Sequence, residues 1–349
     1  MQTQNVCLEA MAYTLPEKIL SSKEIEEKLG SLAKRFELPS GFFEILTGIK
    51  ERRVWAEDIL PSQKSIESAK KLMQENGLTA KDMDCIVHVS VSRDFLEPAT
   101  ATAVHHGLNL PESCMAFDIT NACLGFLNGM MLIASMIETG QIQRGLIVGT
   151  EIPTKMVQSM IQKLLTSPTL TLEEASFIFP TLTLGSGSCA MTLAHPSVSK
   201  TKHRLIGGLA QNDTTQFDVC KAWPDTGIFN SDSSISMKTQ SQALITKAIT
   251  LAQKTWPLFL KEISWNQQDV SHIFSHQVGR MPREEMLKAI NLKSHLDFPT
   301  YEFLGNMGSV SLPISMAMGI EKRKVQPHDK VVLFGFGSGV HCFCMGVKW

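Results

Sequence analysis

A cysteine between an extended apolar segment and a strongly apolar helix constrains this chain more than any other feature. The block Asn121-Ala-Cys-Leu-Gly-Phe126 follows residues 114–120, which are typical of a short buried strand. It precedes residues 124–138, which carry almost no charge and predict a buried helix that stops at Gly140. Cys123 is therefore expected where a helix N-terminus favours a thiolate and a developing oxyanion. A single cysteine is more often a small core residue, so its function depends on partners elsewhere.

Two later segments supply such partners. His276 follows the apolar run 270–274, which predicts a position at the carboxyl end of a buried strand, where α/β sheets bind their ligands. Asn306 lies in a glycine-rich turn, between a short extended stretch and a helix predicted over residues 311–320. Taken singly, the histidine would more often be a satisfied core residue, and the asparagine would more often serve the backbone of its turn.

Taken together, these blocks resemble the thiolase superfamily and, within it, the β-ketoacyl-ACP synthase III group. In that group a nucleophilic cysteine, a histidine followed by glutamine, and an asparagine between glycines occur in this order. The resemblance extends from residues 47–53 through 183–190 to 334–340. It implies an α/β chain with the thiolase fold, five layers in the order α-β-α-β-α built from two duplicated halves. Residues 1–195 would carry the nucleophile, and residues 196–349 would carry the histidine and the asparagine.

The segment at residues 90–99 narrows the resemblance to the OleA-type acyl-CoA condensing enzymes of olefin biosynthesis. In those enzymes a glutamate before a proline reaches the active site of the partner subunit, and the matching residue is Glu97. Joining two ordinary acyl thioesters requires removal of an α-proton by a positioned base, whereas a decarboxylating synthase generates its carbanion by losing carbon dioxide. The alternative is that Glu97 is a solvated loop carboxylate beside Arg93 and Asp94.

The resemblance implies a role for each candidate site residue. Cys123 would accept the acyl group, His276 and Asn306 would donate to the thioester oxygen of the second substrate, and Glu97 would be the general base. The backbone N–H groups of Cys123 and Ser338 would form a second oxyanion hole. The implied enzyme is an acyltransferase that joins two fatty acyl-CoAs without decarboxylation, as a homodimer in which Glu97 acts in trans. Decarboxylating condensation of malonyl thioester, an HMG-CoA-synthase-like reaction, and an inactive scaffold or hydrolase are alternatives.

Basic residues near the start of the chain are candidates for binding the carrier. Lys50, Arg52 and Arg53 are suited to the phosphates of coenzyme A or to an acidic carrier protein, although a solvated turn explains them as well. Leu46 departs from the group, because synthases that begin fatty-acid synthesis often carry arginine there. Gly125 departs from the olefin enzymes, which tend to have alanine. No cofactor is implied beyond the coenzyme A or phosphopantetheine of the substrate.

Composition sets the remaining expectations. The net charge of −1 over 349 residues gives no sign of nucleic-acid binding, and no apolar stretch is long enough to predict a membrane span. Eight cysteines without a CxxC pair indicate reduced thiols in the cytoplasm. Residues 341–344 contain one histidine and two cysteines, but strand alternation argues against a metal site there. Residues 156–165 have the apolar spacing of an acyl-tunnel wall or, equally, of a core or dimer helix.

Overall fold

The computed structural model describes residues 1–224, 235–322 and 324–349. Its strands are β1 (Cys7–Thr14), β2 (Ile19–Ser21), β3 (Glu51–Arg53), β4 (Cys85–Val89), β5 (Met115–Ile119), β6 (Arg144–Glu151), β7 (Gly187–Ala194), β8 (Arg204–Asn212), β9 (Cys220–Pro224), β10 (Ile235–Thr239), β11 (His272–Ser275), β12 (Lys330–Gly337) and β13 (His341–Lys348). Its α-helices are α1 (Ser22–Lys28), α2 (Gly30–Arg35), α3 (Phe42–Thr47), α4 (Pro61–Glu75), α5 (Thr100–Gly107), α6 (Gly125–Glu138), α7 (Thr154–Thr166), α8 (Leu172–Ser176), α9 (Ser241–Glu262), α10 (Arg280–Ala289), α11 (Tyr301–Leu304) and α12 (Ser311–Glu321).

The main sheet combines strands from both ends of the chain. Nine of the described strands follow the order β11-β12-β13-β8-β1-β7-β6-β4-β5. The strands up to residue 194 lie together on one side, and those from residue 204 onward lie on the other. The two sides meet where Cys7 of β1 pairs with Arg204 of β8. The predicted division into residues 1–195 and 196–349 stays a prediction, with which this distribution of strands agrees.

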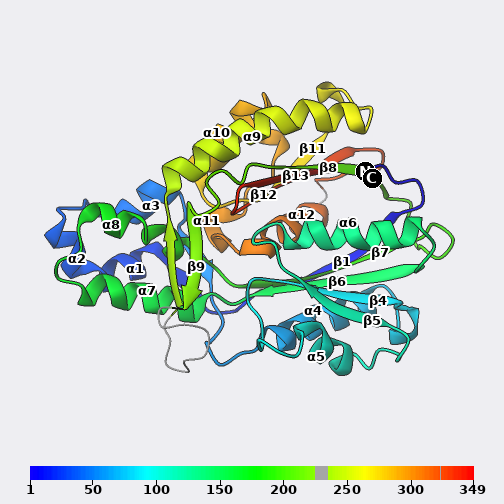
Figure 1. Ribbon diagram of the computed structural model, residues 1–349, viewed down its shortest axis with the longest axis horizontal. Coiled ribbons are helices and arrows are strands. Elements are labelled where there is room, and N and C mark those ends of the chain that lie inside the picture. The colour runs from blue at the N-terminus through cyan, green and yellow to red at the C-terminus, as the bar shows by residue number, and fades with distance from the viewer. Residues whose placement is uncertain (225–234, 323) are drawn as a thin grey trace.

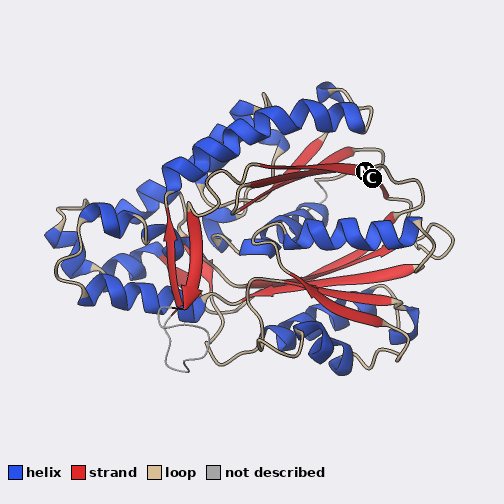
Figure 2. Ribbon diagram, viewed as in Figure 1, coloured by secondary structure: helices blue, strands red, loops and turns tan. Residues whose placement is uncertain are grey.

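The helices complete the layers. Figures 1 and 2 show α6 and α12 between the two sides of the sheet, α9 and α10 over the outer face of one side, and α4 and α5 over the outer face of the other. This is the five-layered α-β-α-β-α arrangement that the thiolase fold predicts. The two helices of the central layer are buried along most of their length. The N-terminus of α6 is thereby held next to the asparagine block, because a Cβ atom added to Gly125 would lie 3.7 Å from Ser309 Cβ.

Helix α6 is apolar because it is enclosed by both sides of the sheet. Phe126, Met130 and Ile133 are buried in the largest apolar cluster of the described chain. Gly129 brings the helix close to the sheet, because a Cβ atom added there would lie 3.0 Å from Val89 and 3.1 Å from Ile147. The sequence prediction of a helix buried on all sides is confirmed for most of its length.

The strand before the cysteine forms, but it is less buried than its sequence suggests. It is β5, the last strand of the nine, and Met115 is 42% exposed. The expectation of a buried strand was wrong because an apolar run does not reveal whether both edges of a strand are paired within its own chain.

Helix α7 corresponds to the apolar run at residues 156–165. Its buried residues Val157, Met160 and Leu164 pack in a cluster with Ile25 and Leu182. The structure favours the core interpretation of this helix over the tunnel wall.

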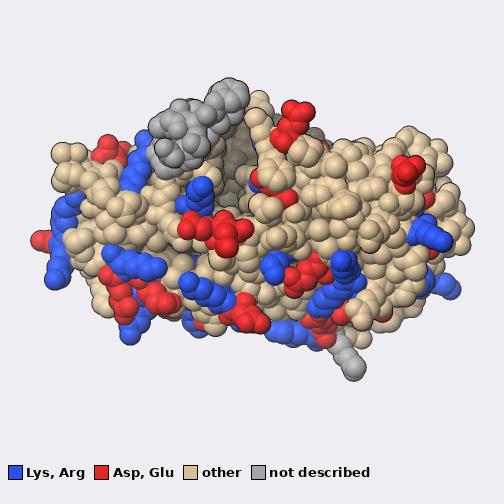
Figure 3. Space-filling view, turned by 90° about the horizontal axis from the view of Figure 1, so that it is seen from below, with Lys and Arg blue, Asp and Glu red and all other residues tan. Residues whose placement is uncertain are grey.

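No helix in the described ranges has the length and apolar character needed to cross a membrane. On the face drawn in Figure 3, basic and acidic side chains lie among one another rather than in one large area of a single sign. That distribution offers no extended basic surface for a polyanion on this face.

Candidate active site

Cys123 lies in the tight turn that joins β5 to α6. The turn is closed by backbone hydrogen bonds from Leu124 N to Asn121 O at 2.9 Å and from Gly125 N to Ala122 O at 3.3 Å. Ala122 adopts a positive φ of 45°, a conformation that a side chain makes costly and that a tightly packed turn must maintain. The sharp reversal places the thiol at the start of the helix and at the wall of a cavity.

That cavity brings the separate sequence blocks together. It has a volume of about 1090 Å³, and its wall includes Cys123, His276, Asn306 and Ser338. Such a volume is at the upper end of the ~300–1,000 Å³ of small-molecule sites. Apolar side chains form much of the remaining wall: Phe177, Phe179, Met237, Leu244, Ile245, Met281, Met286, Leu287, Phe336 and Val340. The site therefore combines a thiol and two hydrogen-bonding side chains with space for an apolar substrate.

His276 directly follows β11, as its apolar context predicted. Burial lowers the pKa of its imidazole to about 4, so the ring is neutral at pH 7 and carries one N–H. Its Nδ1 atom is buried without a hydrogen-bond partner among the described residues. A neutral ring of this kind can donate one hydrogen bond to a substrate oxygen from its other nitrogen, Nε2.

Gln277 explains how the histidine block and the asparagine block are held together. Its side-chain oxygen accepts from Thr300 N at 2.8 Å and from Tyr301 N at 3.2 Å, and its Nε2 donates to Phe298 O at 2.8 Å. These bonds satisfy the N–H groups that open α11. The sequence expectation of an extended stretch before Asn306 was wrong because this cap comes from a residue more than twenty positions away.

Asn306 is fixed by its own turn and by a neighbouring block. Gly308 N donates to the side-chain oxygen of Asn306 at 2.9 Å, which leaves the side-chain Nδ2 for the cavity. Asn306 N donates to Thr183 O at 2.9 Å, and Gly185 N donates to Asn306 O at 2.9 Å. A side chain at Gly185 would place Cβ 2.2 Å from Leu304 O, so only glycine permits this close approach.

The thiol of Cys123 differs from its predicted state. Burial raises the pKa of Cys123, and nearby Cys220 and Glu151 raise it further, while its own backbone N–H acts in the opposite direction. The expectation of a lowered pKa was wrong, because desolvation of the buried thiol outweighs the effect of the backbone N–H. The proton of Cys123 must therefore leave as part of the reaction with the acyl donor.

Ser338 belongs to the turn between β12 and β13 and reaches the same cavity as Cys123. This position agrees with the backbone role that the family resemblance gives it, which stays a prediction.

The three basic candidates differ in where their side chains lie. Arg52 is fully buried, donates to Ser22 Oγ at 3.1 Å and has its pKa lowered to about 10 by burial. Burial of its guanidinium does not fit a contact with substrate phosphates. Arg53 donates to Pro16 O at 3.2 Å, and exposed Lys50 Nζ lies 3.8 Å from Glu302 Oε2. None of the three lines the cavity that contains Cys123.

Glu97 is exposed and does not line the cavity of its own chain. Its neighbours Phe95 and Leu96 are 51% and 67% exposed. Asp94 fixes the same loop by accepting from Ser62 N at 2.9 Å. The loop thus presents a carboxylate flanked by apolar side chains to the outside of the chain.

Several cavity residues were not identified from the sequence. Arg283 donates to Asp297 Oδ2 at 2.5 Å, and Lys247 Nζ lies 3.2 Å from Asp213 Oδ2. Cys220 is a second thiol in the same wall as Cys123. No sequence motif marks these residues, since their placement depends on how α9, α10 and β9 surround the cavity. The described residues contain no group of three or more histidine, cysteine or carboxylate side chains that could hold a metal ion.

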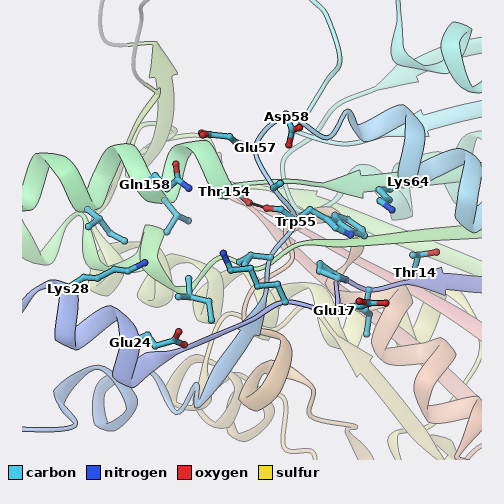
Figure 4. Close-up of a pocket in the computed structure, with 18 of the residues that line it drawn as sticks. Thr14, Glu17, Glu24, Lys28, Trp55, Glu57, Asp58, Lys64, Thr154 and Gln158 are labelled. Atoms are coloured by element: carbon cyan, nitrogen blue, oxygen red, sulfur yellow. Dashed lines mark hydrogen bonds between the residues drawn. The ribbon is translucent and has the colours of Figure 1, made fainter.

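A second cavity of about 840 Å³ lies away from these motifs (Figure 4). Trp55, Lys64 and Thr154 are part of its wall, and Thr154 Oγ1 donates to Trp55 O at 2.7 Å. Both carboxylates and lysines contribute to its wall, which contains none of the residues of the cysteine, histidine or asparagine blocks.

Comparison with known proteins defines the class to which this fold and site belong. Residues 117–165 match the family of 3-oxoacyl-[acyl-carrier-protein] synthase III, and residues 260–349 match the C-terminal family of the same enzymes. The solved 3-oxoacyl-(acyl carrier protein) synthase III, FabH, of Xanthomonas oryzae superposes with a TM-score of 0.92 at 31% identity, with all of both chains covered. The chain is thus a thiolase-fold acyltransferase of the ketoacyl synthase III group.

Relatives that match over their full length narrow the assignment from the synthase III group to one family. The acyl-CoA:acyl-CoA alkyltransferase of Shewanella oneidensis is 35% identical, and that of Xanthomonas campestris is 30% identical, each with 100% of both chains covered. The cerulenin-bound structure of Xanthomonas campestris OleA superposes with a TM-score of 0.93 at 31% identity, covering 100% of this chain and 98% of that one. The chain belongs to the family of acyl-CoA:acyl-CoA alkyltransferases.

Proposed function

We propose that this protein joins two fatty acyl-CoAs by a non-decarboxylating Claisen condensation through an acyl-cysteine. The observation that carries this proposal is the convergence of Cys123, His276 and Asn306 on one largely apolar cavity. Each comes from a different part of the chain, and together they supply a nucleophile and two donors for an enolate oxygen. The relatives named for acyl-CoA:acyl-CoA alkyl transfer support the choice of substrates.

The first half-reaction loads the enzyme. The Cys123 sulfur attacks the carbonyl carbon of the first acyl-CoA, a new C–S bond forms, and the C–S bond to coenzyme A breaks. The proton of Cys123 leaves with coenzyme A as its free thiol. Backbone N–H groups of Cys123 and Ser338, which lie in the same wall, stabilise the oxyanion of the tetrahedral intermediate. The division into two steps replaces one difficult condensation with two easier ones.

The second half-reaction forms the carbon–carbon bond. A base removes the α-proton of the second acyl-CoA, and the enolate oxygen accepts hydrogen bonds from His276 and Asn306. The α-carbon attacks the acyl-cysteine carbonyl, the C–S bond to Cys123 breaks, and the sulfur regains the proton from the base. The product is a β-ketoacyl-CoA. Neutral His276 suits this step because an N–H donor stabilises the enolate without itself being a strong acid.

Glu97 of the partner subunit is the proposed base. Its carboxylate is outside its own cavity, so it acts only by reaching a cavity on a second copy of the chain. The free edge of β5, with Met115 42% exposed, and the exposed Phe95 and Leu96 are apolar surfaces that a homodimer would cover. Solved variants of the Xanthomonas campestris relative replace one histidine, one glutamate and one cysteine.

The first candidate for the substrate carrier is coenzyme A, and the second is the phosphopantetheine of an acyl-carrier protein. No other cofactor is proposed. Lys50 and Arg53 remain candidates for its phosphates because both side chains reach solvent. We place the enzyme in the cytoplasm, since the eight cysteines in the structure are all free thiols.

Product analysis by mass spectrometry tests the proposal. The wild-type protein is incubated with acyl-CoAs of several chain lengths, with and without isotopically labelled malonyl-CoA. The expected result is a β-keto product from two acyl-CoAs alone, with an acyl adduct on Cys123 and no release of carbon dioxide. A product that forms only with malonyl-CoA, together with labelled carbon dioxide, would instead establish a decarboxylating synthase. Release of free fatty acid alone would establish a hydrolase.

A further inference from the structure

A buried carboxylate lies between the loop that carries Glu97 and the turn that carries Asn306. Glu151 is the last residue of β6 and is only 5% exposed. On one side, its Oε1 accepts from Val91 N at 3.1 Å, and its Oε2 accepts from Ser92 N at 3.2 Å and from Ser92 Oγ at 3.0 Å. These bonds fix the beginning of the loop that reaches Glu97.

On its other side, the same carboxylate binds the asparagine turn. Ser309 Oγ donates to Glu151 Oε1 at 2.6 Å, and Ser309 N lies 3.4 Å from the same oxygen. The turn rests directly on the carboxyl group, because a Cβ atom added to Gly308 would lie 3.2 Å from Glu151 Cδ. Gly308 is also the residue whose N–H orients the Asn306 amide.

We propose that Glu151 is a positioning residue that sets the base-carrying loop and the enolate-binding turn relative to each other. The inference rests on the proposed function, in which Glu97 removes the α-proton and Asn306 stabilises the enolate. In a two-fold dimer the loop supplies Glu97 to the cavity of the partner subunit, whereas the turn supplies Asn306 to the cavity of its own chain. Glu151 therefore links the base of one active site to the enolate donor of the other, and its loss is expected to slow condensation without slowing the loading of Cys123.

A carboxylate is required because every group around it donates. Val91, Ser92 and Ser309 each direct a backbone N–H toward the two oxygens, and a backbone N–H cannot accept in return. Replacement of Glu151 by glutamine puts an NH₂ group in place of one oxygen, and that group meets at least one of these donors. The buried N–H left without an acceptor is costly, so the loop or the turn must shift. A shift of about 1 Å in a reacting group is enough to cost on the order of 10²-fold in rate.

The test compares the two half-reactions in Glu151→Gln. Loading is followed by mass spectrometry of Cys123 with one acyl-CoA, and condensation by product formation with a second acyl-CoA deuterated at its α-carbon. Because the charge of Glu151 also raises the pKa of Cys123, its removal is expected to leave loading as fast as in wild type or faster. Condensation is expected to be slower by roughly 10- to 100-fold, with a larger deuterium isotope effect. A variant that is only less stable would slow both steps equally and leave the isotope effect unchanged. That result, or wild-type condensation, would overturn the inference.

Glu9→Gln is the matched control. Glu9 is a buried carboxylate of the same exposure, 5%, but it binds Arg144 Nε at 2.7 Å in another part of the sheet. Its replacement is expected to lower the melting temperature without changing the ratio of the two rates or the isotope effect.

Two serine variants test the inference even where Glu151→Gln does not fold. Ser92→Ala removes one donor on the loop side, and Ser309→Ala removes one on the turn side. Each is expected to slow condensation more than loading, and equal effects on both steps would contradict the positioning role. If wild-type protein forms no β-keto product from two acyl-CoAs, the proposed function fails before any variant is compared.

Discussion

The backbone N–H of Gly308 donates to the side-chain oxygen of Asn306 at 2.9 Å, and this single bond sets which end of the amide faces the cavity. Because the oxygen is occupied, the side-chain nitrogen is the group available to a substrate. Asn306 therefore serves its own turn and supplies a donor to the cavity at the same time. The sequence left open whether Asn306 serves the backbone of its turn or donates to a substrate, and this geometry is compatible with both.

The variant Asn306→Asp separates the role of Asn306 in its own turn from its role as a donor to the cavity. Aspartate keeps an oxygen for Gly308 N but has no N–H to offer, and its charge opposes a developing enolate. We expect kcat for condensation to fall by about 10²- to 10³-fold, as for the loss of an oxyanion-hole donor, with loading of Cys123 far less affected. Single-turnover assays of the two half-reactions measure this difference, and an equal fall in both would exclude a role in enolate binding.

The raised pKa of Cys123 predicts how its reactivity varies with pH. Below its pKa the thiolate fraction grows about tenfold per pH unit. The rate of alkylation of Cys123 by iodoacetamide is therefore expected to increase continuously from pH 6 to pH 9. Peptide mass spectrometry after timed quenching gives the rate at each pH. A plateau near neutral pH would show instead that the helix N-terminus stabilises the thiolate in the functional enzyme.

Local sequence pattern was sufficient for an element whose burial can be inferred from its own residues. The uncharged residues after Cys123 predicted the enclosed helix α6. The motif resemblance identified Cys123, His276 and Asn306, although their convergence depends on the fold of the whole chain.

Long-range partners account for what the sequence pattern missed. Helix α11 begins where Gln277 binds the N–H groups of Thr300 and Tyr301, a cap that no local motif reveals. Arg52 is buried over Phe43, with its guanidinium 5.4 Å from the ring centre, although its neighbours in sequence suggested a basic surface. Glu151 carries no motif, because its donors come from two loops that are distant in sequence.

A pair of glycine substitutions tests the packing around the site. Gly185→Ala would force a Cβ to within 2.2 Å of Leu304 O, so the Asn306 turn must move; we expect a loss of about 2–3 kcal/mol in the free energy of unfolding. Gly125→Ala places its Cβ 3.6 Å from Val89, an ordinary contact, and is expected to change stability by less than about 1 kcal/mol. Urea unfolding of both variants measures the contrast, and similar losses would show that the described packing is wrong.

His88 predicts an acid-dependent loss of stability. Burial lowers the pKa of this imidazole to about 4, although nearby Asp118 and Asp94 act in the opposite direction. The unfolded chain binds a proton near pH 6.5, whereas the folded chain does not until about pH 4, so stability falls as the pH decreases through this window. His276 adds an effect of the same sign.

The His88 effect can be isolated by substitution. His88→Leu removes one titrating group and leaves no ring nitrogen to bury. We expect the slope of unfolding free energy between pH 6.5 and pH 4 to decrease by up to about 1.4 kcal/mol per pH unit. Chemical unfolding at a series of pH values measures the slope, and an unchanged slope would mean that His88 binds its proton equally well in the folded and unfolded chains.

Glu97 does not line the cavity of its own chain that contains Cys123, so two inactive variants should complement each other if Glu97 acts in trans. A Glu97→Gln chain keeps its cysteine, and a Cys123→Ala chain keeps its glutamate. In a mixed dimer, one of the two cavities then contains Cys123 and faces Glu97 of the partner subunit. Since random pairing makes half the dimers mixed, co-expression should restore roughly a quarter of wild-type condensation, while either variant alone stays inactive. If both residues act within one chain, no mixture of these variants regains activity.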